Sequence, residues 1–222
     1  MYLHKTIQAS ITFLPDSWKE TYGGFLEEEH LTTFSKKMEI CIKNGIPEKY
    51  PLPRFDKEIT IPYEEAIQSF KTILTSKNHM ASPIHWAQTI QSAPFEHLLI
   101  IIGQRWTAST LKNEKAIPPL KKTLLNSCTA PFNDQICCGS RAWEKHIDRC
   151  KDQFWGEIKG NSTQKGKIAH QLITKIIENK TWWNIFYHHK HGPVYEIRVS
   201  SGHGIRWNSK GTQLIGFLEP FL

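Results

Sequence analysis

The sequence predicts an α+β fold, with mixed elements in the N-terminal half, two central helices and a C-terminal antiparallel β-meander. Apolar residues recur with helical spacing over 133–150 and again over 161–179. Four short strand-like runs follow, separated by turns rich in glycine and proline. Helices combined with an antiparallel sheet of this kind define the α+β class.

The N-terminal half carries the weaker structural signals. Residues 6–13 alternate polar and apolar side chains, which is the period of a half-buried strand. Residues 27–44 place apolar side chains on one helical face, and Gly45 is expected to end that helix. A further helix is expected over 63–75, whereas the apolar run 98–102 fits either a strand or a helix.

The C-terminal half carries clearer signals for helix starts and strand boundaries. Asn133 or Asp134 is expected to cap the first central helix, because short polar side chains accept hydrogen bonds from the first helical N–H groups. Asn161 or Ser162 is expected to cap the second central helix in the same way. The strands of the meander are expected at 182–189, 194–200, 205–208 and 212–218.

Length and composition favour a single domain over residues 1–222, with residues 133–222 the more distinctive half. A hydrophobic content of 39% with 22% charged residues is typical of globular proteins. No apolar stretch approaches the length of a membrane span, and the start of the chain lacks the pattern of a signal peptide. The five cysteines are odd in number. We therefore expect an intracellular protein, cytoplasmic or nuclear, with reduced thiols and no membrane partner.

The net charge of +7 is concentrated in the C-terminal half of the chain. Residues 1–111 sum to −1, and residues 112–222 sum to +8. A basic half of this kind suggests an anionic partner, such as nucleic acid or a phosphorylated ligand. Solvated lysines that only aid solubility are the alternative.

The first central helix carries a row of three cations. Arg141, Lys145 and Arg149 are spaced four residues apart, which places them along one side of a helix. His146 lies beside this row. Aligned cations next to a proton donor suit a phosphate group, so an anion-binding site is expected here. A solvated helix face, compensated by neighbouring acidic residues, is the alternative.

The meander contributes a second group of charged residues. Glu196 and Arg198 alternate onto the same face of the second predicted strand, and Arg206 is expected on a neighbouring strand. A ladder of cross-strand salt bridges is the structural alternative to a binding site. The additional candidates for this cluster are Asn184, His188 and Glu219.

A distinctive pattern of residues runs through the last part of the chain. It comprises Arg141-Ala142-Trp143-Glu144-Lys145-His146, Phe154-Trp155-Gly156, Arg206-Trp207 and Gly216-Phe217-Leu218-Glu219-Pro220. Together these stretches resemble a family of small, uncharacterised proteins that end in a Gly-Phe-Leu-Glu-Pro motif. The resemblance implies no known activity, cofactor or catalytic residue.

The leading functional hypothesis is binding of a phosphate-bearing anion, preferably nucleic acid, where the first central helix meets the sheet. The anion-binding residues would be Arg141, Lys145, Arg149, Arg198 and Arg206. The alternative is a nuclease or phosphoesterase in which His146 and Glu196 transfer protons. A non-catalytic protein-interaction domain is a further alternative, and the sequence leaves open whether the protein is an enzyme.

Three other chemistries have weaker support. Arg141 and His146 have the Arg-x4-His spacing of HEPN-type ribonucleases, although a strand-rich C-terminus does not suit that all-helical fold. The cysteines and histidines lack the spacing of a known zinc site, so no metal and no cofactor are expected. Aromatic residues beside cations can stack on bases, although core packing is their commoner role. The tryptophans concerned are Trp155, Trp182, Trp183 and Trp207.

Overall fold

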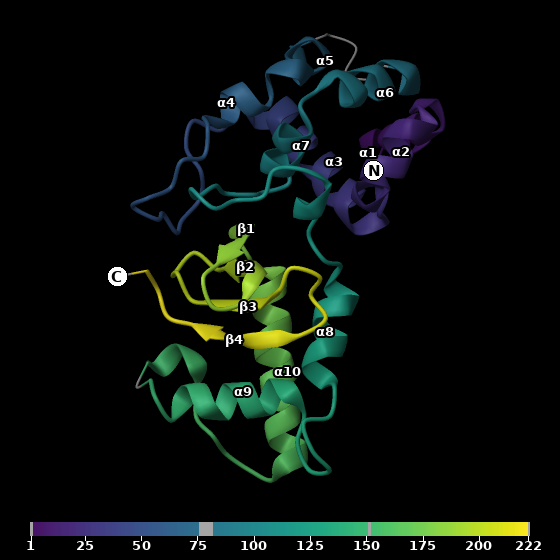
Figure 1. Ribbon diagram of the computed structural model, residues 1–222. Coiled ribbons are helices and arrows are strands. Elements are labelled where there is room, and N and C mark those ends of the chain that lie inside the picture. Colours follow the sequence, from purple (N-terminus) through teal and green to yellow (C-terminus); the bar gives the residue numbers. More distant parts are fainter. Residues whose placement is uncertain (1, 76–81, 151, 222) are drawn as a thin grey trace. The chain divides into compact units, whose positions relative to one another are not determined.

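The computed structural model describes residues 2–75, 82–150 and 152–221, and the contacts within the chain group them into two compact units (Figure 1). The N-terminal unit consists of Met1–Tyr50, Ile59–Gln104 and Lys112–Ile117. The C-terminal unit consists of Pro51–Glu58, Arg105–Leu111 and Pro118–Leu222. That the two units form the single domain expected over residues 1–222 stays a prediction.

The N-terminal unit is built from helices around an aromatic core. Phe34 packs edge-on against Phe25, Phe70 and Trp86, and all four side chains are fully buried. Its α-helices are α1 (Tyr2–Ser10), α2 (Asp16–Tyr22), α3 (Glu28–Asn44), α4 (Tyr63–Ala66), α5 (Lys71–Thr75), α6 (Pro83–Ser92) and α7 (Phe95–Ile101). None of the helices in the described part of the chain is long and apolar enough to cross a membrane.

The strand predicted over residues 6–13 is wrong, because this segment belongs mainly to α1. Leu3, Ile7 and Ser10 are buried. Their spacing of four and then three residues places them on one face of a helix. The polar–apolar alternation does not follow that face, because Ala9 and Phe13 are exposed. The ambiguous run 98–102 falls mostly in helix α7. The described residues of the N-terminal unit thus contain helices and no β-strand, so the mixed elements expected there are helical.

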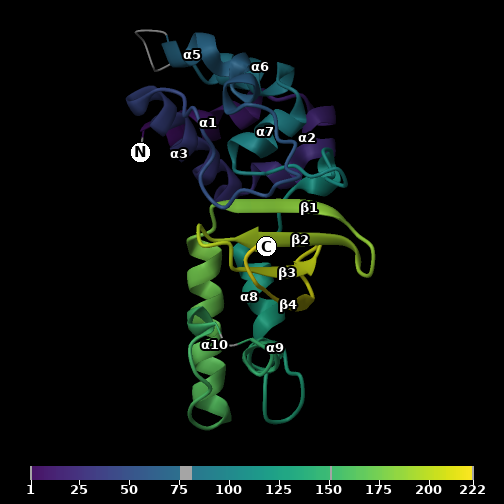
Figure 2. The same ribbon diagram turned by 90° about the vertical axis from the view of Figure 1, so that its left-hand side faces the viewer.

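Within its described residues, the C-terminal unit combines three α-helices with a four-stranded antiparallel sheet, which confirms the α+β class and the C-terminal meander. Its helices are α8 (Lys121–Thr129), α9 (Cys138–Ile147) and α10 (Ser162–Glu178). Its strands are β1 (Trp182–His188), β2 (Gly192–Arg198), β3 (Gly204–Asn208) and β4 (Leu214–Leu218). Figure 2 shows the strands side by side in chain order, and each pairs with the next.

The two central helices begin in different ways. A capping box starts α10 as expected, because Asn161 accepts from the backbone of Gln164 and the Gln164 side chain accepts from the Asn161 backbone. The predicted start of the first central helix at Asn133 or Asp134 is wrong. The Asn133 carboxamide oxygen instead accepts from two backbone N–H groups of a turn, and Cys137 caps α9. Arg149 lies beyond the end of α9.

The sheet has one apolar and one polar face. The apolar face packs on α8, α9 and α10, and the Trp207 indole N–H donates to the Ser127 hydroxyl of α8 at 3.1 Å. We call this side the helix face; its buried residues are Trp183, Ile185, Tyr195, Ile197, Ile205, Trp207 and Phe217. The opposite side, the polar face, carries Glu196 and Arg206, which are directly paired across β2 and β3.

A glycine on β3 is required by close approach of the neighbouring strand. A Cβ at Gly204 would clash with the Ile197 carbonyl oxygen and with the Arg198 side chain. We expect Gly204→Ala to lower the free energy of unfolding by about 1–3 kcal/mol, the usual cost of overpacking. Gly216→Ala is the matched control on β4, because a Cβ there meets nothing within 4 Å. Urea denaturation of both variants measures the effect, and equal stability of the two would contradict it.

Candidate functional site

The polar face of the sheet holds one buried carboxylate between two arginines. Glu196 is 1% exposed. Its Oε1 accepts from Arg198 Nε at 2.6 Å, and its Oε2 accepts from Arg206 Nε and Nη2 at 2.9 and 2.6 Å. Asn184 is paired with Glu196 in the register of β1 and β2. These four residues form the Glu196 cluster, which carries a net charge of one positive unit.

Arg198 ties this cluster to the turn after β2 and to the end of β4. Its Nη1 donates to the carbonyl oxygens of Gly202 and Glu219, at 2.5 and 2.7 Å. Its guanidinium lies over the Phe221 ring, 3.8 Å from the ring centre. Burial lowers the pKa of Arg198, and the charge and hydrogen bond of Glu196 oppose that shift. Arg198 therefore holds the Glu196 carboxylate in position.

A cavity of about 430 Å³ borders the Glu196 cluster. Aromatic rings, hydroxyl groups and a lysine complete its wall, and all of them belong to the C-terminal unit. Besides Glu196, Arg198 and Arg206, the lining residues are Phe55, Lys57, Thr107, Ala108, Ser109, Trp182, Phe186 and Phe221. Cations next to aromatic rings suit a ligand that carries both a phosphate and a flat ring.

Two buried polar atoms near this cavity have no hydrogen-bond partner among the described residues. They are the Asn184 Oδ1 acceptor and the Trp182 Nε1 donor. The Asn184 amide nitrogen is occupied, because it donates to Thr110 Oγ1 at 2.8 Å. Buried polar atoms without partners are costly, so this acceptor and this donor are suited to a ligand or water.

His188 lies at the end of β1, and its titration is affected by the Glu196 cluster. Burial lowers the pKa of His188, and the positive charge of Arg206 lowers it further. The His188 ring stacks with His189 and His191, with ring centres 4.5 and 4.9 Å apart. Three imidazoles therefore gather at the hairpin that joins β1 and β2.

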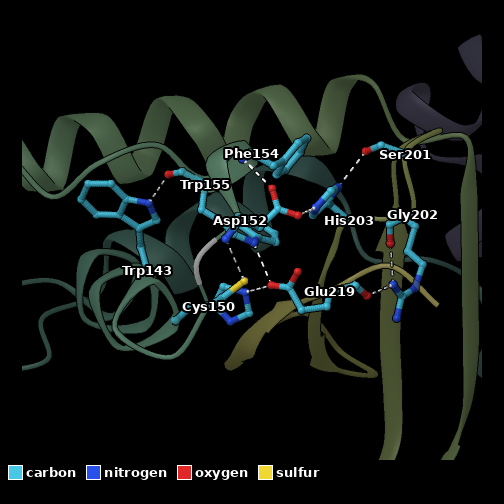
Figure 3. Close-up of polar contacts among 11 residues, drawn as sticks. Trp143, Cys150, Asp152, Phe154, Trp155, Ser201, Gly202, His203 and Glu219 are labelled. Atoms are coloured by element: carbon cyan, nitrogen blue, oxygen red, sulfur yellow. Dashed lines mark hydrogen bonds and ion pairs between the residues drawn. The ribbon is translucent and has the colours of Figure 1, made fainter. Parts of the chain in front are cut away.

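A second polar group lies at the helix face and is centred on the Glu219 side chain (Figure 3). Glu219 Oε1 is 2.6 Å from His146 Nε2 and accepts from Trp155 Nε1 at 2.8 Å. Cys150 also hydrogen-bonds this carboxylate and, through that bond, has a raised thiol pKa. Burial acts to raise the pKa of Glu219, but the bonds from Cys150, Trp155 and His146 outweigh it and lower the pKa.

A chain of three side chains adjoins this group. His203 lies between Asp152 Oδ2 at 2.8 Å and the Ser201 hydroxyl at 2.9 Å (Figure 3). The Phe154 ring stacks on the His203 ring, with centres 3.9 Å apart. The backbone N–H of Phe154 and the His203 ring lower the pKa of Asp152. We call these residues together with His146, Cys150, Trp155 and Glu219 the Glu219 cluster.

The structure brings together only part of the predicted site. Glu196, Arg198, Arg206 and Asn184 meet on the polar face, and His188 interacts with them electrostatically. The two predicted proton-transfer residues lie in different clusters. His146 contacts Glu219, Trp155 and Phe217, whereas Glu196 contacts the arginines. Arg198 joins the clusters through the backbone of Glu219.

The row of cations on the first central helix is exposed. The Arg141 guanidinium lies over the Phe132 ring, 5.7 Å from its centre, and Lys145 and Arg149 are exposed. Because α9 packs on the helix face, this row lies apart from the Glu196 cluster. The four tryptophans considered for base stacking are all buried, and of these only Trp182 lines the cavity among the described residues.

Several residues that line the cavity belong to no pattern that the sequence analysis recognises. Phe55 and Lys57 come from segment 51–58, and Thr107 and Ser109 come from segment 105–111. Neither segment has the periodicity of a helix or strand, so pattern analysis does not select them. Thr110 forms an isolated bridge with Phe186, which places segment 105–111 beside β1.

Comparison with known proteins finds a family model that matches part of the chain. Residues 125–219 match the model of the CdiA C-terminal tRNase toxin domain. A solved structure of the toxic C-terminal tip of CdiA from Pseudomonas aeruginosa, in complex with an immune protein, is 24% identical. That match covers 42% of this chain and 99% of the other, with a TM-score of 0.38. No curated protein matches the chain.

This match corrects the resemblance drawn from the sequence. The Arg-Trp and Gly-Phe-Leu-Glu-Pro motifs lead to a family of uncharacterised proteins without known activity. The family model that covers nearly all of these residues is instead described by an activity, cleavage of tRNA. The identification of an uncharacterised family is therefore wrong.

Proposed function

We propose that the C-terminal unit is a ribonuclease that cleaves tRNA at the Glu196 cluster. The observation that carries the proposal is the buried Glu196 carboxylate, which lies between two arginines of the segment matched to a tRNase family and borders a cavity. The family match supports the reaction class, and the cavity supports its location. Anion binding, the leading hypothesis from the sequence, becomes one part of this reaction.

The Glu196 cluster supplies a carboxylate base and part of the positive charge that cleavage of an RNA phosphodiester needs. The ribose 2′-oxygen attacks phosphorus, an O2′–P bond forms, and the P–O5′ bond breaks. Glu196 Oε1 accepts one hydrogen bond from Arg198, and a carboxylate oxygen has room for a second donor. We assign removal of the 2′-hydroxyl proton to this oxygen. The fragments would end in a 2′,3′-cyclic phosphate and a 5′-hydroxyl.

Arg206 and Lys57 are the cations placed to meet the phosphate. Arg206 is 17% exposed and Lys57 is exposed, and both line the cavity. Positive charge aimed at the phosphorane lowers the barrier because negative charge develops there. His188 lies on the same face of β1 as Asn184 and Phe186, and we assign to it the transfer of a proton to the departing 5′-oxygen. Arg198 has the different role of holding Glu196 in place.

The exposed cations of the first central helix are proposed to bind the substrate outside the cavity. Arg141, Lys145 and Arg149 are exposed, so they are accessible to a phosphate backbone. A tRNA carries many phosphates besides the one that is cleaved, and these lie outside the cavity. Lysines and arginines that contact them add affinity without taking part in cleavage. This contribution is expected to weaken as salt concentration rises.

The test is incubation of the full chain with purified tRNA, an unstructured RNA and a DNA strand of the same sequence. We expect discrete tRNA fragments on denaturing gels, with cyclic phosphate at their 3′ ends, and intact DNA because it lacks the 2′-hydroxyl. Arg206→Ala should strongly reduce the fragments. Salt-dependent binding of tRNA with no cleavage at any enzyme concentration would overturn the ribonuclease and leave an anion-binding domain.

A further inference from the structure

We propose that His146, Cys150 and Glu219 form a binding site for a zinc ion. His146 Nε2, Cys150 Sγ and a Glu219 carboxylate oxygen all lie within 4.8 Å of one another. They come from α9, the turn that follows it and the residue after β4, so three elements hold them. One nitrogen, one sulfur and one oxygen donor form a set that Zn²⁺ accepts readily.

In the structure, hydrogen bonds join the three ligand side chains at the place where the ion would bind. Glu219 is bonded to His146 at 2.6 Å and to Cys150. Zn²⁺ would replace the Cys150 thiol proton and any proton on His146 Nε2, and both would be released to solvent. The bonds formed are Zn–S, Zn–N and Zn–O, with no change in oxidation state. Binding is therefore expected to weaken as pH falls.

The surroundings of the three donors also suit a bound ion. The Trp155 indole N–H donates to the Glu219 carboxylate at 2.8 Å, and such an outer partner orients a ligating carboxylate. The Glu219 side chain is 41% exposed, which leaves access for the ion and for a water in the fourth position. Asp152 and His203 form another close group with Glu219 and add a further carboxylate.

The sequence predicts no metal because the ligands are far apart along the chain. His146 and Cys150 are four residues apart, but Glu219 lies 73 residues beyond His146. No compact spacing motif signals such a site. The zinc proposal is independent of the ribonuclease proposal, because metal binding is measured without RNA.

The test is titration of the metal-free, reduced full chain with Co²⁺, which occupies zinc sites and absorbs visible light. We expect one equivalent to bind and to produce the thiolate-to-cobalt charge-transfer band, which Zn²⁺ then abolishes by displacement. Cys150→Ser should lose this band. Cys138→Ser is the matched control, because Cys138 lies on α9 with similar partial exposure and outside the cluster. It should keep the band.

Peptide-resolved alkylation of the wild-type protein provides a second readout that does not depend on a variant. We expect Zn²⁺ to slow modification of Cys150 at least tenfold and to leave Cys138 unchanged. Co²⁺ binding without a thiolate band would place the ion elsewhere, for instance on His188, His189 and His191, and would overturn the proposal. Equal alkylation of Cys150 with and without Zn²⁺ would also overturn it.

Discussion

Glu196→Gln is expected to lower the rate of tRNA cleavage by about 10²–10⁴-fold, the usual contribution of a general base. Glutamine keeps the shape of the side chain, and its single carbonyl oxygen still accepts from one of the two arginines, but it does not take up the proton of the 2′-hydroxyl. The rate should be measured under single-turnover conditions with enzyme in excess, so that binding does not limit it.

The matched control for this prediction is Glu157→Gln, which removes an exposed carboxylate of the same unit. Glu157 is 73% exposed and pairs with Lys159, outside the cavity. Its variant should cleave like the wild type. Circular dichroism at the assay temperature should confirm that Glu196→Gln is folded. A folded Glu196→Gln protein that cleaves within threefold of the wild type would rule out Glu196 as the base.

Arg198→Ala is expected to lower the free energy of unfolding by about 3–5 kcal/mol, the cost of breaking a buried ion pair. Arg198 is 4% exposed, and its loss removes one partner of the buried Glu196. The loss also leaves the carbonyl oxygens of Gly202 and Glu219 without this donor. Urea denaturation, followed by tryptophan fluorescence, measures the change.

Arg141→Ala serves as the control for stability, because it removes an exposed arginine from α9. Surface substitutions of this kind usually change stability by about 0.5 kcal/mol or less. If Arg198→Ala were as stable as Arg141→Ala, Arg198 would not hold the Glu196 cluster together. Its contacts with the two backbone segments would then be of no energetic consequence.

Sequence periodicity predicts the sheet well and the segments around it poorly. The alternation of Glu196 and Arg198 with apolar neighbours predicts their shared face, because side chains alternate strictly along a strand. Asn161 predicts the start of α10 because capping, too, depends only on residues close together in the sequence. The start of α9 is missed, because its cap is Cys137 and cysteine is not a usual capping residue.

The candidate site is only partly predictable, because it depends on long-range contacts. The sequence groups Glu219 with the strand arginines, but its side chain lies on the helix face and only its carbonyl oxygen reaches Arg198. Residues of 51–58 and 105–111 line the cavity from irregular segments, whose positions follow from tertiary packing. The three cations predicted as one row on a helix are exposed, but Arg149 lies beyond the end of α9, and α9 packs on the side of the sheet opposite the Glu196 carboxylate.

The measurement that most directly tests the location of the site is single-turnover tRNA cleavage by Arg206→Ala beside the double variant Arg141→Ala/Arg149→Ala. At saturating enzyme, we expect Arg206→Ala to lose about 10²–10³-fold in rate, as when a group that stabilises the transition state is removed. The double variant should bind tRNA more weakly but cleave it at nearly the wild-type rate once saturated. Loss of cleavage in the saturated double variant, with cleavage retained in Arg206→Ala, would place the site on the basic helix and contradict this account.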